Sequence, residues 1–96
     1  MAIRTKPFDP ADFLQTEEDI IAYLDAAMED NDPVFIARAL GDVARSKGMS
    51  DIARKAKVGR QALYNALSEN GNPTLETLVG VLKALGLQLT VQKRAA

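Results

Sequence analysis

The chain has 96 residues, of which 47% are hydrophobic and 26% charged, so its composition is that of one folded domain. It contains no cysteine and no histidine, which excludes a disulfide framework and argues strongly against a zinc site or a serine or cysteine triad. No apolar run approaches the ~20 residues of a membrane span, and the amino terminus lacks a signal-peptide core. We therefore expect a cytoplasmic protein without metal or cofactor.

The charges are unevenly distributed, although the formal net charge is only −1. Asp9 to Asp32 contains nine acidic residues and no basic one, whereas Arg45 to Arg60 contains six basic residues opposed only by Asp51. This polarity favours a phosphate backbone as partner of the basic segment and a basic partner for the acidic segment. The alternative for the acidic segment is that its side chains only keep the protein soluble.

The first fifteen residues are expected to form an amino-terminal arm, and residues 16–96 a single helical domain. Two prolines interrupt the arm, and Phe8 and Phe13 would pin it to the domain. A short helical turn is expected from Pro10 to Leu14.

Two amphipathic helices are predicted to follow the arm. Thr16 is a favoured N-cap with acids in the first turn after it, and apolar residues recur at helical spacing over Glu17 to Glu29. Asp32 and Pro33 are a favoured N-cap and first helical residue, respectively. They introduce a helix from Val34 to Ser46 that Gly48 ends. Its predicted buried residues are Ile36, Leu40 and Val43.

Residues 49–67 are predicted to form two short helices joined by a tight turn, a helix-turn-helix. The small Ala53 allows the two helices to cross closely, and Val58 fills the corner between them. The apolar sides of the helices are formed by Ile52, Ala53 and Ala56 in the first and Leu63, Ala66 and Leu67 in the second.

Polar side chains remain on the outer face of the second helix. Arginine and glutamine at its start are suited to guanine and adenine edges in a major groove. The candidate base contacts are Arg60, Gln61, Tyr64 and Asn65, and the candidate phosphate contacts are Arg54, Lys55, Lys57, Ser68 and Asn72. The alternatives are an ordinary surface helix, a Tyr64 that merely lies on it, and Ser68 and Asn72 that serve the loop.

The spacing of apolar residues changes from helical to alternating near the carboxyl terminus. A loop over residues 68–73 leads to a helix capped by Thr74 or Asn72 and closed by Gly86. Residues 87–92 then alternate between apolar and polar, as a half-buried strand does. A lone strand leaves backbone groups unpaired, so we expect pairing with the same strand of a second copy through Leu87, Leu89 and Val91. The alternative is a frayed tail.

The residues of the two short helices and the last helix resemble a known family. The chain is similar to the phage-repressor-like, XRE-type helix-turn-helix proteins through MSDIARKAKVGRQALYNALSENGNPTLETLVGVLKALGLQL. With the acidic leader FDPADFLQTEEDIIAYLDAAMED, the resemblance extends from Phe8 to about Val91 and is to addiction-module antidotes, the HigA-like antitoxins. Lys57 departs from the glycine common at that turn, and Gly59 provides no side-chain cap.

The resemblance implies an all-α fold: a five-helix lambda-repressor-like DNA-binding domain with an amino-terminal helical extension and a short carboxyl-terminal dimerisation strand. It implies an antitoxin that neutralises a small basic RelE/ParE-like toxin and, as a homodimer, represses its own palindromic operator. The alternative is a stand-alone regulator of the same fold, and a third hypothesis is a helical adaptor that never touches DNA. No catalytic residues are expected, because no acidic pair stands in a setting that would raise a pKa.

Overall fold

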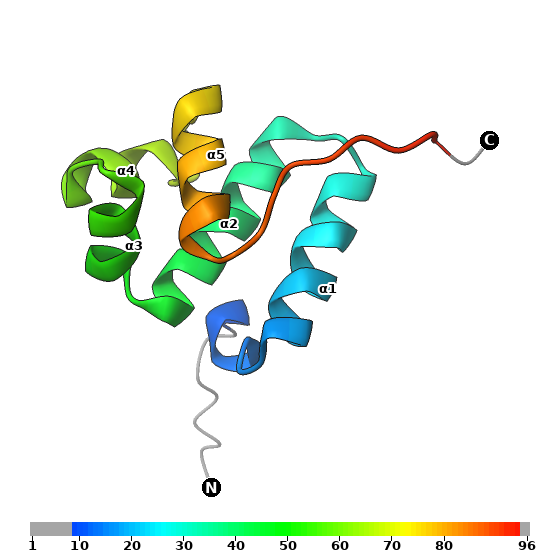
Figure 1. Ribbon diagram of the computed structural model, residues 1–96, viewed down its shortest axis with the longest axis horizontal. Helices are drawn as coiled ribbons and strands as arrows, with labels where there is room; N and C mark the ends of the chain where they lie inside the picture. The colour runs from blue at the N-terminus through cyan, green and yellow to red at the C-terminus, as the bar shows by residue number, and fades with distance from the viewer. Residues whose placement is uncertain (1–8, 95–96) are drawn as a thin grey trace, which may run out of the picture.

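The computed structural model describes residues 9–94, and these residues form an all-helical domain (Figure 1). Phe8 of the expected arm lies outside the described residues. The elements in chain order are a 3-10 turn η1 (Pro10–Phe13) and the helices α1 (Glu17–Glu29), α2 (Pro33–Lys47), α3 (Met49–Ala56), α4 (Arg60–Ala66) and α5 (Leu75–Ala84). The five predicted helices and the short turn before them are confirmed.

Three of the five helices, α1, α2 and α5, begin where a side chain accepts from one of their first N–H groups. Thr16 and Asp19 form a capping box, in which the Thr16 hydroxyl accepts from the Asp19 N–H at 3.0 Å and the Asp19 carboxylate accepts from the Thr16 N–H at 3.1 Å. The Asp32 carboxylate accepts from the Val34 N–H at 3.0 Å. Thr74, one of two caps left open by the sequence, accepts from the N–H of Thr77 at 3.1 Å. Local capping therefore sets the starts of α1, α2 and α5.

Helix α2 lies between α1 on one side and α3 to α5 on the other (Figure 1). Leu40 and Val43 are fully buried in its central stretch, whereas Ile36, predicted to be buried, is only half-buried. The close approach of α2 to Leu67, the residue that follows α4, depends on Gly41, because a Cβ there would lie 2.7 Å from the carbonyl oxygen of Leu67. The remaining core residues are Leu14, Ile20, Leu24, Ala27, Ala39, Ala44, Ile52, Ala53, Leu63, Leu67, Val81 and Leu82.

The turn between α3 and α4 is built as predicted around a non-glycine residue. Lys57 has φ 61° and ψ 40°, the left-handed conformation, and its N–H donates to the Arg54 carbonyl at 3.2 Å. Val58 follows, half-buried, with its N–H donating to the Ala53 carbonyl at 3.0 Å. The corner between α3 and α4 is therefore held at Lys57 at a conformational cost.

Replacing Lys57 with glycine is expected to raise the free energy of unfolding by about 1 kcal/mol, because glycine adopts a positive φ without strain. Urea denaturation followed by circular dichroism measures the change. Lys55→Gly, two residues earlier in the regular part of α3, is the matched control and should lower it by about 1 kcal/mol. Equal shifts for the two variants would contradict the assigned strain.

The carboxyl-terminal segment leaves α5 without forming a helix or strand among the described residues 87–94. Leu87 packs against the core of its own chain, and its N–H donates to the Leu82 carbonyl at 2.8 Å. Leu89 and Val91 are 48% and 95% exposed. The predicted strand over residues 87–92 is thus not found in the described single chain, since a strand needs a second strand to pair with.

Candidate functional site

The four predicted base-contact residues lie together on the outer face of α4. Arg60, Gln61, Tyr64 and Asn65 are all exposed, and Tyr64 is 55% accessible. The Gln61 amide donates to the Asn65 side-chain oxygen at 3.1 Å, which orders both amides one helical turn apart. On the opposite side of the helix Leu63 is completely buried. Helix α4 therefore presents an arginine, two amides and a phenol on a surface anchored from behind.

The predicted phosphate contacts differ in how their charges are already balanced. Arg54 and Lys55 both pair with the carboxylate of Asp51, Lys55 at 3.4 Å, so binding an anion would compete with that carboxylate. Lys57 is exposed and, within the described residues, makes no ion pair. The Ser68 hydroxyl donates to the Asn65 carbonyl at 2.7 Å, and Asn72 lies exposed in the following loop.

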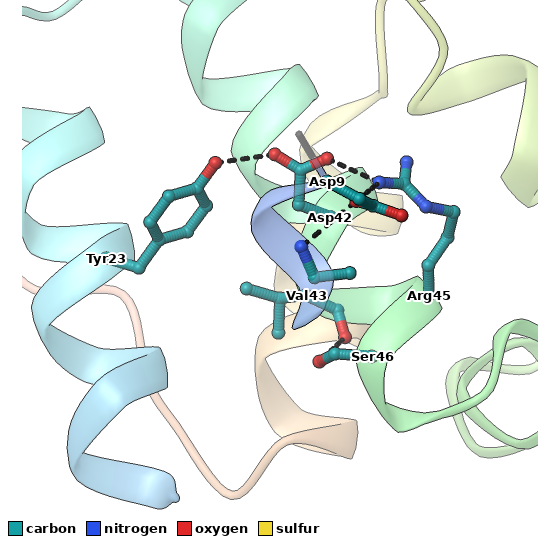
Figure 2. A network of polar contacts seen from close by, with 7 residues as sticks. Asp9, Tyr23, Asp42, Val43, Arg45 and Ser46 are labelled. Carbon is teal, nitrogen blue, oxygen red and sulfur yellow. Dashed lines mark hydrogen bonds and ion pairs between the residues drawn. The ribbon is translucent and has the colours of Figure 1, made fainter. Parts of the chain in front are cut away.

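A buried carboxylate that the sequence analysis did not single out ties three elements together (Figure 2). Asp42 of α2 is 4% exposed and accepts from the Tyr23 hydroxyl of α1 at 2.5 Å and from the Arg45 guanidinium at 2.8 Å. Arg45 also donates to Asp9, just before η1, at 2.8 Å. Arg45, counted above in the basic segment, is therefore neutralised within its own chain. The one signal in the sequence is an acid placed between the core residues Leu40 and Val43.

The network shifts the pKa of each of three groups. Burial and the hydrogen bond to Asp42 raise the pKa of Tyr23 to about 12. The Ala11 N–H and the Arg45 guanidinium lower the pKa of Asp9. Burial opposes the charged form of Arg45, but hydrogen bonds to Asp9 and Asp42 outweigh it and raise the pKa of that guanidinium. The Tyr23 phenol is therefore neutral and the Arg45 guanidinium charged near pH 7.

Replacing Tyr23 with phenylalanine is expected to lower the free energy of unfolding by about 1–2 kcal/mol near pH 7, because Asp42 loses a hydrogen bond. The folded pKa of Tyr23, about 12, lies above the value of about 10 of an unfolded tyrosine. The advantage of the wild type over the variant is therefore full below pH ~10 and shrinks as pH rises from ~10 to ~12. Parallel urea titrations measure it, with the exposed Tyr64→Phe as control. A constant difference across this range would contradict the assignment.

A shallow groove of about 380 Å³ lies between α2 and α4, beside the network. Tyr64 lines it on the α4 side, and Glu69 forms an ion pair with Arg38 of α2 at 3.8 Å. The charged side chains that line the groove are thus paired, so the groove offers no unpaired cation to an anionic ligand. The described residues contain no group of acids that could hold a metal ion, nor a helix long and apolar enough to cross a membrane.

Residues 4–93 of the chain match the protein family described as "probable addiction module antidote protein". The chain belongs to this family. The match spans both the acidic helix α1 and the pair α3–α4. Over 93 residues the chain is 46% identical to an "uncharacterized protein" of Haemophilus influenzae, and the alignment covers 97% of this chain and 96% of that protein. No solved structure matches. Membership in an antidote family implies a toxin as partner.

Proposed function

We propose that this antidote-family protein neutralises a small basic toxin of the RelE/ParE-like class and, as a homodimer, represses the promoter of its own operon in the cytoplasm. The observation that carries the repressor half is the exposed polar face of α4, held from behind by the buried Leu63. The family match supports the antidote half. The proposed fold type is the HigA-like, XRE-type variant of the lambda-repressor-like domain.

In the repressor half, α4 is the recognition helix. Arg60 is exposed and, in the described part of the chain, without an ion pair, so its guanidinium is available for the two acceptors of a guanine edge. Gln61 and Asn65, which bond each other, have the donor and acceptor needed for adenine. Tyr64 would contact bases beside them. Arg54, Lys55 and Lys57 would lie at phosphates, together with Ser68 and Asn72.

In the antidote half, the outer face of α1 is the surface proposed for the toxin. It carries exposed acids along its whole length, namely Glu17, Glu18, Asp25 and Glu29, and the exposed Asp30 and Asp32 follow it. In the described residues none of these six forms an ion pair. A basic partner would therefore be attracted by uncompensated charge, which raises association rates and favours complementary surfaces.

The homodimer is proposed to include the carboxyl-terminal segment. Leu89 and Val91 are exposed on a stretch with alternating polarity, and its backbone has no strand partner among the described residues. Leu87 packs against the core of its own chain, so it would lie at the start of the strand that pairs with the second copy. Two copies would then present two α4 helices to a palindrome.

The proposal is tested by co-expressing the protein with the neighbouring gene, followed by affinity capture and a promoter-shift assay on the same material. We expect a small basic protein to be captured and the native promoter to be retarded. An Asp25→Lys/Glu29→Lys variant should lose the captured protein but keep the promoter shift, because its α4 is unchanged. A promoter shift with no captured partner would instead support the stand-alone regulator. Failure of both assays would overturn the proposal.

A further inference from the structure

Two apolar side chains at the start of helix α2 remain exposed in the folded chain. Val34 is 54% and Phe35 38% exposed, whereas Leu40 and Val43 of the same helix are completely buried. At 100° per residue, the exposed pair lies on the side of α2 opposite to the buried pair. Scattered exposed apolar residues are common, but neighbouring ones rimmed by polar groups mark interaction surfaces. The first turn of α2 is therefore a candidate contact surface.

The connection between α1 and α2 places these two side chains beside three acids. Asn31 has a left-handed conformation with φ 54°, and its N–H donates to the Met28 carbonyl at 3.0 Å. The chain thus reverses between the two helices, at the end of α2 remote from α3 (Figure 1). Local hydrogen bonds hold this turn in the single chain, so a partner would meet a preorganised surface. We call Glu29, Asp30, Asp32, Val34 and Phe35 the α1–α2 corner.

The negative charge of the α1–α2 corner is not compensated within the described chain. Glu29, Asp30 and Asp32 are exposed, and none of them forms an ion pair. The nearest cation along the sequence, Arg38, pairs instead with Glu69 at 3.8 Å. Protein interfaces combine an apolar centre, enriched in aromatic residues, with a polar rim. The corner has this composition, and its rim is acidic. Its complement is a partner surface on which an apolar side chain is surrounded by lysine or arginine.

We propose that the basic toxin docks on the α1–α2 corner, with an apolar side chain against Val34 and Phe35 and lysines or arginines against the three acids. The inference rests on the proposed antidote function and deepens it, because that function assigned only attraction by charge to this surface. Contacts at the buried centre of an interface mainly slow dissociation. Charges at its rim mainly speed association and are screened by salt. The two halves of the corner therefore have different kinetic signatures.

The test measures binding of the full chain to the product of the neighbouring gene, purified from the co-expressed complex in denaturant and refolded. Surface plasmon resonance gives both rate constants at low and at high salt. Phe35→Ala should weaken binding roughly 30-fold or more, mainly through faster dissociation and to a similar extent at both salt concentrations. Val34→Lys should weaken it roughly tenfold or more, because it removes an apolar contact and repels a basic partner.

A second variant tests the acidic rim without changing its shape. Glu29→Gln/Asp30→Asn/Asp32→Asn removes three charges with near-isosteric side chains, and asparagine at position 32 still caps α2. Its association rate constant should be about tenfold lower than that of the wild type at low salt. The difference should shrink at high salt, where the wild-type charges are screened.

Tyr64→Ala is the matched control for truncation of an aromatic side chain. Tyr64 is more exposed than Phe35 and lies on α4, away from the corner, so this variant should bind the partner as the wild type does. Thermal unfolding of every variant separates lost contacts from lost stability. If Phe35→Ala does not fold, Val34→Lys decides the test, since Val34 is the more exposed of the two.

The outcomes distinguish this inference from the proposed function. If the wild type binds the partner but folded Phe35→Ala and Val34→Lys bind it equally well, the inference is wrong and the antidote function stands. If the wild type does not bind, both are wrong. If the two variants change only the sedimentation of the free chain, a second copy or the carboxyl-terminal segment covers the corner, and the inference is overturned. Weaker binding of these variants with an unchanged Tyr64→Ala control supports it.

Discussion

An Arg60→Ala variant is expected to bind the native promoter about 5- to 150-fold more weakly than the wild type, a loss of roughly 1–3 kcal/mol. The reason is that Arg60 begins α4, is exposed, and forms no ion pair within residues 9–94, so its donors are free for a base edge. The loss should be concentrated at one base-pair position of each half-site. A gel-shift titration with the native promoter and single-base variants measures both the loss and its position.

The Lys57→Gly variant is the matched control for this experiment. It removes one charge at the turn before α4 while relieving the left-handed strain, so weaker binding cannot be ascribed to a less stable fold. It should weaken binding to all DNA sequences alike and reduce the slope of log K against log salt by about 1 per protomer. If neither Arg60→Ala nor Lys57→Gly changed promoter binding, α4 and its preceding turn would not be the DNA-binding surface.

A Leu63→Ala variant is expected to lose about 2–5 kcal/mol of the free energy of unfolding. Leu63 is 0% exposed and is one of the largest fully buried side chains. Helix α4 has only 7 residues, far below the length at which an isolated helix is stable in water. Its stability therefore depends on the packing of Leu63 in the core. In a domain of this size such a loss is a large fraction of the total stability. Urea denaturation measures it.

The neighbouring Tyr64→Ala variant separates anchoring from recognition. Tyr64 is exposed, so its truncation should change the free energy of unfolding by no more than about 0.5 kcal/mol. If Tyr64 contacts bases, the same variant should nevertheless weaken promoter binding. A Leu63→Ala variant as stable as wild type would mean that α4 is not held by its inner face.

The elements that could be predicted from the sequence are those decided by neighbours along the chain. The bounds of α1, Glu17–Glu29, agree with the prediction because Thr16 caps the helix through Asp19, three residues away. The exposure of Arg60 and Gln61 follows in the same way from the spacing of apolar residues in α4, whereas the left-handed Lys57 was suggested only by the glycine common at that turn in the resembled family. Helical periodicity and capping act over three or four residues, a range that the sequence displays directly.

The charge count along the sequence overstated the free basic charge. Arg54 and Lys55 pair with Asp51 at helical spacing, which the sequence contains but the count ignored. Arg45 pairs with Asp9, 36 positions away, which no local pattern reveals. Among the described residues, fewer than the six cations counted are without an ion pair. Two of these unpaired cations lie near the start of α4: Lys57 in the turn before it and Arg60 as its first residue.

By itself, the sequence of this protein determined the five helices, the caps of α1 and α2 and the polar face of α4, because each depends on interactions within one or two helical turns. Only the tertiary structure revealed that Tyr23, Asp42 and Arg45 meet, that Gly41 lets α2 approach Leu67, and that Leu75 and Val79 of α5 are exposed. Those features depend on how whole helices pack. Contacts between residues 19 or 36 positions apart form only when burial of the core brings their helices together.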